Sequence, residues 1–567
     1  MTRNTPSLPL SQAFVPAQTP SFADLITQLQ GRTKLSASRK RDMISGLTRL
    51  AKALGLPPSD VPCDGRWLQP RLSQVRPQLI GLKPKSWQNA VSDARMAMVE
   101  VGIVERRANR LTDLDTCWRP LWEAVLATND PTLPTALRRF THFLNRLGIP
   151  PEDVTDAHAT TYLEALATNE ISKDPDRAYR AAVNGWNLAA DRIPAWPKRR
   201  LTLPSRQKRI KLDPAAFPKT FIEEVEALLD GLANPDPFSP TAPGQPRSPA
   251  TIRQYRMQLI RFASHLVASG MPPSDIKSLS VLIDPAIAKR GLKQMLSHTN
   301  GRTSRDISGT ASLLRNVARL LDAPEEIREA MAQLAQKVAL PIQNGMTPRN
   351  RERLRILQAP EHTRRLLLLP DHIFKTHTKP SRAKANALAF EDAVAIAILL
   401  VCPVRVGSLA RITLDQHIQR PGDGRVFLVL EEADTKTNRS IEFELPADVV
   451  ALLDRFLAMR TPHRCPPGTR FLFPRRDGNR PVDPNALSSR IAKRIRKETG
   501  LCVNAHLFRH FAVMNWLDAN PGGYEVARRL LGHSDLSHTI NMYSGLEVTS
   551  ATKAFSDLVE DLRKNSP

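Results

Sequence analysis

The sequence is poor in acidic residues relative to basic ones. Its 567 residues include 56 Asp and Glu against 81 Lys and Arg, which gives a formal net charge of +25. Such an excess is atypical of an enzyme of small metabolites and indicates a polyanionic partner, either nucleic acid or an anionic membrane surface. Hydrophobic residues still make up 41% of the chain, which indicates a globular protein and excludes a disordered basic tail.

Cysteine and aromatic residues are also scarce. The five cysteines are scattered and form no C-x-x-C pair, which disfavours both a disulfide framework and a zinc finger and predicts a reducing compartment. Aromatic residues account for only 5% of the chain. Capture of single strands by base stacking is therefore disfavoured, and duplex DNA is the better candidate among nucleic acids.

Long apolar runs are missing. The most apolar stretch covers the twelve residues 393–404, whereas a membrane span needs about 20 residues. Residues 1–20 contain no continuous apolar stretch of the kind that a signal peptide requires, and residues 1–19 are predicted to be a disordered leader. These absences favour nucleic acid over a membrane as the partner.

A short motif, Gly-x-Pro-Pro-x-Asp, occurs three times, beginning at Gly55, Gly148 and Gly270. Each copy follows a basic amphipathic stretch, at 36–54, 133–147 and 250–269. Glycine supplies the left-handed residue after a helix end, and proline prevents the helix from continuing. Chance recurrence of helix ends is the alternative, but the same placement in three segments favours an internal repeat.

The repeat predicts three tandem four-helix units at 20–112, 113–196 and 218–345. Each unit would start with a short helix, at 22–30, 121–128 and 221–232, and end with a longer one, at 87–101, 177–190 and 307–321. Residues 197–217 form a basic linker, for which a solvated connection and a strap along DNA phosphates both remain open.

The pattern changes in the last part of the chain, about 360–560. Helical stretches are predicted at 385–400, 447–459, 485–499, 507–518 and 523–531. Two strand-like runs, 425–430 and 440–445, are joined by the polar residues 435–439, as expected of a hairpin. The sequence therefore predicts a mainly α protein, with tandem four-helix units followed by an α-rich domain that holds a small antiparallel sheet.

Four local strings in this last domain carry candidate functional side chains. Taken singly, each has an ordinary structural explanation: a salt-bridged arginine, a solvated lysine, a structural histidine or a packed tyrosine. In chain order they supply an arginine after the apolar helix, a lysine on the hairpin, His-x-x-Arg, Leu-Gly-His and a tyrosine. These residues are Arg405, Lys436, His506, Arg509, His533 and Tyr543.

This order of motifs strongly resembles the catalytic domain of the tyrosine recombinase (phage integrase) family, over residues 360–560. More loosely, 218–345 is similar to the family's core-binding, SAM-like domain. The family often has an acidic residue soon after the first arginine, where this chain has Ser408. That departure weakens the local match but leaves Arg405 in place.

The resemblance implies cutting and rejoining of duplex DNA through a covalent 3′-phosphotyrosine, without ATP, metal or any other cofactor. Arg405 and Arg509 would clamp the phosphate, and Tyr543 would attack it. The other three residues would handle protons and orientation, with His506 as base or proton partner, Lys436 as acid for the 5′ oxygen and His533 as a phosphate or orienting contact. No G-x-x-x-x-G-K-[ST] motif is present.

Further basic residues are candidates for DNA contacts, although a solvated basic helix is the alternative. They are Arg490, Lys493 and Arg494 in the helix 485–499, and Arg253 and Arg256 in the third unit. The resemblance also implies a tetramer on paired DNA sites and a cytoplasmic, nucleoid-associated location. It leaves open a second recombinase or accessory protein, a catalytically silent DNA-binding protein, and a strand-relaxing enzyme of the type IB topoisomerase kind.

Overall fold

The computed structural model describes residues 15–564, apart from 17, 108–109, 173, 204–209, 237, 239–244, 342–344 and 437. Most of the leader predicted at 1–19 therefore lies outside the described residues. The chain divides into two compact units, Pro204–Gln343 and the combination of Met1–Leu203 with Asn344–Pro567. The buried hydrophobic residues form four cores, within 22–104 together with Ile171, within 114–201, within 217–338 and within 346–543.

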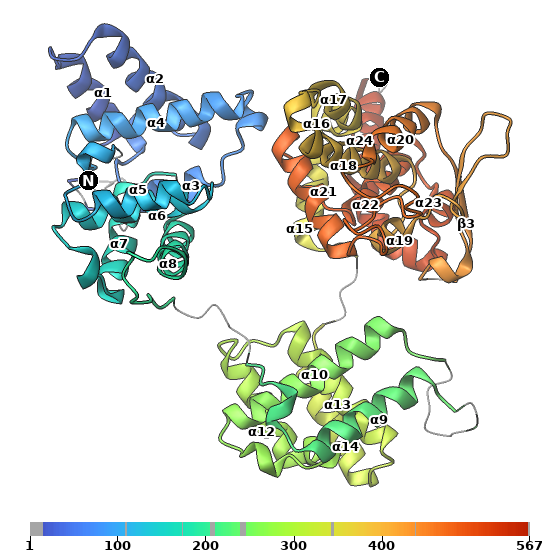
Figure 1. Ribbon diagram of the computed structural model, residues 1–567. Coiled ribbons are helices and arrows are strands. Elements are labelled where there is room, and N and C mark those ends of the chain that lie inside the picture. Colours follow the sequence, from blue (N-terminus) through green and yellow to red (C-terminus); the bar gives the residue numbers. More distant parts are fainter. Residues whose placement is uncertain are drawn as a thin grey trace, which may run out of the picture. The chain divides into compact units, whose positions relative to one another are not determined.

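The first two cores belong to two consecutive groups of four α-helices, drawn in blue and cyan in Figure 1. The first group contains α1 (Phe22–Gly31), α2 (Ala37–Leu54), α3 (Gly65–Leu72) and α4 (Pro84–Glu100). The second contains α5 (Arg119–Ala127), α6 (Leu133–Arg146), α7 (Asp156–Asn169) and α8 (Pro175–Arg192). The helices predicted to start and end these two units lie within two residues of the observed bounds, except that α4 starts three residues earlier than predicted.

The recurring motif has the same conformation in all three places. Gly55, Gly148 and Gly270 have φ angles of 71°, 68° and 93°, which a residue with a side chain adopts only under strain. The following Pro-x-Asp residues form single turns of 3-10 helix, at Pro58–Asp60, Pro151–Asp153 and Pro273–Asp275. The motif therefore ends the second helix of each group and reverses the chain in the same way.

The second and fourth helices of each of the first two groups pack closely, α2 on α4 and α6 on α8. Each pair contains a glycine at the contact. A Cβ atom on Gly46 would lie 2.8 Å from the Ala90 carbonyl oxygen, and one on Gly185 would lie 3.0 Å from the Ala136 Cβ. The absence of a side chain at these two positions lets the helix axes approach.

The third group, drawn in green and yellow in Figure 1, has six helices instead of the four predicted. They are α9 (Lys219–Ala233), α10 (Pro249–Ala268), α11 (Leu279–Ile283), α12 (Pro285–Ser297), α13 (Arg305–Leu320) and α14 (Glu325–Lys337). The chain breaks between α11 and α12 because Asp284 caps the N–H groups of Ala286 and Ile287, and Pro285 cannot continue the preceding helix. The additional helix α14 packs Met331 and Ala335 into the same core.

The first half of the predicted basic linker is packed on the second helix group. Trp196 and Leu201 belong to its core. The Trp186 indole donates to the Arg199 carbonyl at 2.8 Å, and the Asn187 amide donates to the Leu201 carbonyl at 2.9 Å. Residues 198–203 are thus not a free connection, whereas 204–209 lie outside the described residues.

The last core is enclosed by helices and a small sheet. Its helices are α15 (Pro348–Leu357), α16 (Pro360–Leu367), α17 (Leu369–Thr376), α18 (Ala383–Val401), α19 (Val406–Arg411), α20 (Ala447–Arg460), α21 (Pro484–Thr499), α22 (Leu507–Ala519), α23 (Tyr524–Leu531) and α24 (Leu536–Lys564). The antiparallel sheet has the order β1 (Ile418–Gln419), β2 (Phe427–Leu430) and β3 (Ile441–Glu444). In the β2–β3 register Phe427 pairs with Glu444 and Leu430 with Ile441, so the connection between them is longer than the predicted tip.

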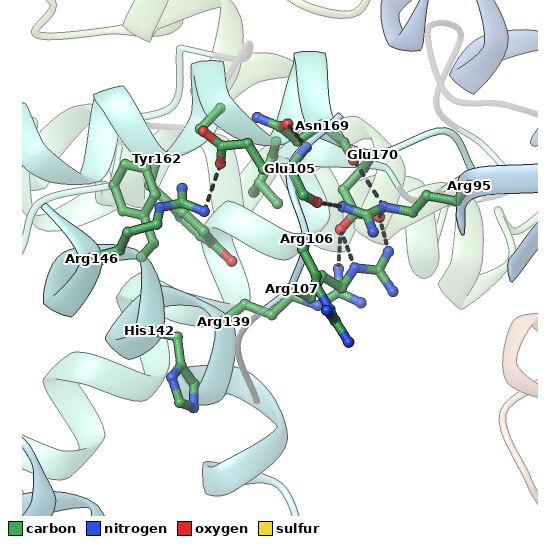
Figure 2. Close-up of a pocket in the computed structure, with 13 residues that line it drawn as sticks. Arg95, Glu105, Arg106, Arg107, Arg139, His142, Arg146, Tyr162, Asn169 and Glu170 are labelled. Carbon is green, nitrogen blue, oxygen red and sulfur yellow. Dashed lines mark hydrogen bonds and ion pairs between the residues drawn. The ribbon is translucent and has the colours of Figure 1, made fainter. Parts of the chain in front are cut away.

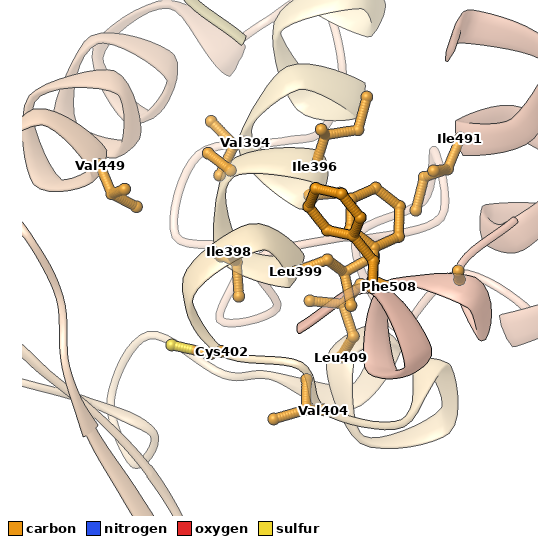
Figure 3. Packing of buried hydrophobic residues seen from close by; sticks show 14 of the residues in the cluster. Val394, Ile396, Ile398, Leu399, Cys402, Val404, Leu409, Val449, Ile491 and Phe508 are labelled. Carbon is orange, nitrogen blue, oxygen red and sulfur yellow. The ribbon is translucent and has the colours of Figure 1, made fainter. Parts of the chain in front are cut away.

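Helix α18 is the centre of this core. Its residues Ile396 and Leu399 lie on the side of Phe508 of α22 and Ile491 of α21, whereas Val394 lies on the side of Val449 of α20 (Figure 3). Helix α18 is apolar, but neither it nor any other helix in the described part of the chain is a candidate membrane span.

Two acidic residues of α18 are completely or almost completely buried, Glu391 and Asp392. Glu391 forms ion pairs with Arg464 and, at 2.6 Å, with Arg490 of α21. Asp392 is paired with Arg490 at 2.9 Å and with Arg494 at 3.2 Å. The charges buried in α18 are therefore matched by arginines, and these pairs hold α21 against it.

Replacing Glu391 by Gln should lower the free energy of unfolding by about 3 kcal/mol, because Arg464 and Arg490 would lose a buried counter-charge. The exposed pair of Asp454 with Arg420 offers a matched control. Asp454→Asn should cost less than about 1 kcal/mol. Urea denaturation, combined with hydrogen exchange of the α18 amides, measures both, and equal losses in the two variants would contradict the assigned role of Glu391.

Candidate active site

The first of the six predicted residues, Arg405, follows the carboxyl end of α18. The chain leaves α18 through Cys402 and Pro403, and Arg405 is the N-cap residue of α19. Its guanidinium makes no hydrogen bond or ion pair with any described residue. Partial burial lowers the pKa of Arg405. A half-buried arginine without an anionic partner is able to receive an anion.

Arg509 is buried on α22 and held by main-chain oxygens. Its Nη1 donates to the Pro403 carbonyl at 2.7 Å, and its Nη2 donates to the Leu531 carbonyl at 2.8 Å. Burial, and then the charge of Arg405, lowers the pKa of Arg509 to about 10. These bonds fix the Arg509 guanidinium between the end of α18 and the end of α23.

His533 lies at the turn after α23, where Gly532 has a φ of 58°. Arg509 Nη2 also donates to His533 Nε2, at 3.3 Å. Because arginine only donates, Nε2 is the acceptor, and the proton of the neutral ring is on Nδ1. Nδ1 then donates to the hydroxyl of Thr539, 3.0 Å away and fully buried. Thr539 thus orients the histidine.

Tyr543 lies in the second turn of α24, a helix of 29 residues. Its side chain is 2% exposed, and its hydroxyl lies 2.9 Å from His510 Nδ1. Burial raises the pKa of Tyr543, whereas Arg509 lowers it. The hydroxyl is therefore protonated at neutral pH, and it donates to His510.

His510 is not among the site residues predicted from the sequence. Burial, and then the neighbouring His506, Arg509 and His533, lowers the pKa of His510 to about 3, so its ring is neutral. His506, the predicted proton partner, is exposed and contacts the His510 ring edge-on at 4.9 Å. Although the side chain reaches solvent, partial desolvation of its ring by neighbouring protein atoms, followed by the charges of Arg509 and Arg405, lowers the pKa of His506. The only sequence signal for His510 was its place directly after Arg509.

Lys436 is exposed in the connection between β2 and β3, and no contact places it against the other five residues. The base of this connection is attached to α19 and its neighbourhood. The Ser408 hydroxyl donates to the Asp434 carbonyl at 2.9 Å, and His417 Nε2 lies 3.1 Å from the Asp434 carboxylate. Ser408, where the family often has an acid, thus ties the lysine loop to the helix that begins after Arg405.

The comparison with family models gives one match for this part of the chain. Residues 374–549 match the phage integrase family. This segment is a phage integrase family domain. The matched range contains all six residues predicted from the sequence. The comparison with curated proteins gives no match.

Among solved structures, this chain is similar to Xer recombinases. XerH site-specific recombinase bound to difH substrate, in a pre-cleavage complex, is 14% identical, with coverage of 58% of this chain and 95% of that one and a TM-score of 0.35. XerA recombinase is also 14% identical, with coverage of 58% and 99% and a TM-score of 0.24. XerH in a post-cleavage complex with palindromic difH is 11% identical, with coverage of 61% and 98% and a TM-score of 0.34.

Two of the predicted DNA contacts in the integrase-family domain have structural partners. Arg490 and Arg494 are engaged by Glu391 and Asp392, so their side chains face α18. Lys493 is exposed on α21. For the two arginines, DNA contact stays a prediction, and it would require groups that already hold the core together. Lys493 is the better candidate of the three.

The predicted contacts of the third helix group divide in the same way. Arg253 is exposed on α10, whereas Arg256 forms a forked ion pair with Glu226 of α9. Of this pair, Arg253 is the better placed to meet a phosphate. No cluster of three or more His, Cys, Asp or Glu side chains that could hold a metal ion occurs in the residues that the structure describes.

The low pKa of His510 predicts a pH effect on stability. An ordinary histidine has a pKa near 6.5, so between about pH 6.5 and 3 the unfolded chain binds a proton that the folded chain does not. This contribution lowers stability as the pH falls through that window. The variant His510→Gln should therefore show a slope of unfolding free energy against pH that is shallower by about one proton. Equal slopes from pH 4 to 7 would contradict a buried neutral His510.

Proposed function

We propose that this chain is a site-specific tyrosine recombinase that cuts and rejoins duplex DNA through a covalent 3′-phosphotyrosine. One observation supports it above the others. Five of the six predicted residues interact with one another directly or through His510, although they are spread over 139 positions of the sequence. They are Arg405, His506, Arg509, His533 and Tyr543. Two cations, a buried hydroxyl and neutral imidazoles together suit attack on a phosphodiester.

The two arginines form the phosphate clamp of the proposed reaction. Three N–H groups of Arg509 are bound to Pro403, Leu531 and His533, which leaves two of its five for a phosphate. The Arg405 guanidinium is without a partner among the described residues. Fixed donors stabilise the negative charge that grows on the non-bridging oxygens in the transition state, and they do so without reorganisation.

Tyr543 is the nucleophile, and His510 takes its proton. The Tyr543 hydroxyl is too weakly acidic to attack unaided, because burial raises its pKa. His510 is neutral, and its Nδ1 already accepts the hydroxyl proton at 2.9 Å. The phenolic oxygen then bonds to phosphorus as the bond from phosphorus to the 5′ oxygen breaks. In this proposal His510 has the role of base that the sequence suggested for His506. His506 is then a neighbour of the base.

Lys436 supplies the proton that the leaving 5′ oxygen requires. Its place on a connection anchored by Asp434 allows approach to bound DNA from the sheet side of the domain. Reversal of the same steps by a second DNA end rejoins the strands, so the phosphotyrosine conserves the bond energy and ATP is not consumed.

Lys436→Ala should slow cleavage of an ordinary phosphodiester by about 10²-fold, as for loss of a general acid. A substrate with sulfur in place of the 5′ bridging oxygen has a leaving group that needs no proton. Cleavage of that substrate should be nearly equal in Lys436→Ala and in the wild type. A defect of the same size on both substrates, measured in single-turnover assays, would show that Lys436 is not the acid.

The proposed partners follow from the proposed reaction. We infer duplex DNA as the substrate, a tetramer on paired sites as the active assembly, and a cytoplasmic location at the nucleoid. Whether a second recombinase or accessory protein takes part depends on the sites. The two arginines of the clamp would bind a phosphate in DNA of any sequence. Recognition of a particular site must therefore come from other parts of the protein.

The deciding experiment uses nicked duplexes made from the DNA that flanks the gene. A nick near the cleavage site releases a short fragment after attack and traps the covalent complex. A denaturation-resistant adduct on a defined sequence supports the recombinase. Relaxation of supercoiled plasmids without any site requirement would favour the type IB topoisomerase alternative, and binding without an adduct would favour a silent DNA-binding protein.

A further inference from the structure

A pocket lined by arginines lies where the first two helix groups meet, far along the chain from the integrase-family domain. It has a volume of about 80 Å³, which is room for a few water molecules or one tetrahedral oxyanion. Helices α4, α6 and α7 and the segment after α4 line it. The arginines of its wall are Arg95, Arg106, Arg107, Arg139 and Arg146.

Only two acidic groups oppose these five cations. Glu170, 5% exposed, accepts from Arg107 Nε at 3.0 Å and from Arg139 Nη1 at 3.2 Å, and Arg95 Nε lies 4.0 Å away. Figure 2 shows the three guanidiniums converging on this one carboxylate. Glu105 is paired with Arg146 at 2.6 Å. The pocket wall is left with an excess of three positive charges.

Burial and the neighbouring Arg107 lower the pKa of Arg95 to about 10. Burial likewise lowers the pKa of Arg139. Both shifts mean that the charged form of these side chains is disfavoured by the surroundings as they stand. Arg95 and Arg139 are the two most buried of the five arginines, and an anion in the pocket would offset the cost of keeping them charged there.

Two further donors face the pocket without a partner. Tyr162 is 4% exposed and is held between the rings of Phe140 and Phe143, at centroid distances of 5.0 and 5.2 Å. Its hydroxyl makes no hydrogen bond with any described residue, and Figure 2 shows it on the side of Arg139. Arg106 is exposed at the rim and has no ion pair within the described part of the chain.

We propose that this pocket binds a phosphate-sized oxyanion between Arg139, Arg107, Arg106 and the Tyr162 hydroxyl. Planar guanidiniums match the oxygens of such a group in pairs, and a neutral hydroxyl adds a directed donor. The site goes beyond the proposed recombinase activity and assigns a ligand to the N-terminal helix groups. The phosphate belongs either to a free or small-molecule phosphate, or to the backbone of DNA.

Calorimetric titration of the full chain with inorganic phosphate, at constant ionic strength against chloride, tests the site directly. Wild type should bind phosphate in preference to chloride. Tyr162→Phe keeps the ring packing and all ion pairs but removes one donor to a charged ligand, so the Kd should rise about tenfold or more. Arg106→Gln, which breaks no pair among the described residues, should weaken binding in the same direction.

Matched controls exist for both changes. Tyr179→Phe removes a hydroxyl from a buried tyrosine of the same core, and Arg200→Gln removes an exposed cation that is paired with Asp191 outside the pocket. Both should keep the wild-type Kd. Glu170→Gln removes the competing carboxylate charge and should strengthen phosphate binding. Phosphate bound no better than chloride, or equal Kd values for wild type, Tyr162→Phe and Arg106→Gln, would overturn the proposal.

DNA binding by the same variants distinguishes the two sources. If the phosphate is part of DNA, both pocket variants bind duplex more weakly, free phosphate competes, and Arg106→Gln lowers the slope of log affinity against log salt by about 0.9. If the ligand is a free phosphate, DNA binding by the variants equals that of the wild type although they bind phosphate more weakly. The phosphate titration contains no DNA, so its result stands whether or not the chain cleaves DNA.

Discussion

Replacing Tyr543 by phenylalanine should abolish covalent attachment of the protein to DNA and leave DNA binding almost unchanged. The variant differs from the wild type only in lacking this hydroxyl, which is the proposed nucleophile. The aromatic ring remains in the core of the integrase-family domain, where it is 2% exposed. The lost hydrogen bond to His510 should cost about 1 kcal/mol of stability, too little to unfold the domain.

The measurement is a denaturing gel of the trapped complex, with binding measured in parallel by fluorescence anisotropy. Tyr524 offers a matched control, because it is the other tyrosine of residues 344–567. Tyr524→Phe should form the adduct at the wild-type level. A denaturation-resistant adduct formed by Tyr543→Phe would show that another group attacks the phosphate, and the proposed function would then need a different nucleophile.

The helices of the N-terminal half were predictable because residues at their own ends, such as caps and glycines, determine where they start and stop. Ser36 caps α2 through the Arg39 amide, and Gly55 ends it in the left-handed conformation that a glycine adopts without strain. The Gly-x-Pro-Pro-x-Asp motif uses the same physics in three places. The helix break at Pro285 follows from the same local rules. The helix before it, however, has too few residues to show the hydrophobic periodicity that predicts a helix.

The residue types of the candidate active site were predictable from the sequence, whereas the contacts between them were not. Each of the six residues sits in a recognisable string, yet the partner of Tyr543 is His510, 33 positions earlier in the chain. Only the packing of α24 on α22 brings the two together. No spacing rule relates residues on helices that meet in this way, so a histidine next to the matched Arg509 carried no separate signal.

For the basic helix predicted at 485–499, the sequence did not show which of its cationic side chains face solvent. A helix rich in lysine and arginine is usually solvated or bound to a polyanion, and charge counting cannot show which side chains face inward. Here the buried Glu391 and Asp392 of α18 turn Arg490 and Arg494 toward the core. The signal was present, since two acids inside the most apolar helix need cationic partners, but their partners lie about 100 positions away.

Arg405→Lys and Arg509→Lys should each reduce DNA cleavage by about 10²–10³-fold, the typical cost of losing one fixed donor at a developing oxyanion. Lysine keeps the positive charge but lacks the planar fork that binds two phosphate oxygens at once. Single-turnover cleavage of a nicked duplex at saturating protein measures the effect. Arg425→Lys, a change to an exposed arginine paired with Asp423, should cleave at the wild-type rate.

The two arginine variants should differ in stability even where they agree in rate. Arg509 donates to the carbonyls of Pro403 and Leu531 inside the core, and its replacement leaves buried acceptors unsatisfied, at a cost of about 1–3 kcal/mol. Arg405 has no such bonds among the described residues, so Arg405→Lys should unfold at the wild-type denaturant concentration. A slow but stable Arg405→Lys variant would place its loss in the transition state. Wild-type cleavage by Arg405→Lys would instead mean that the phosphate is held by Arg509 alone and that the clamp of two arginines is wrong.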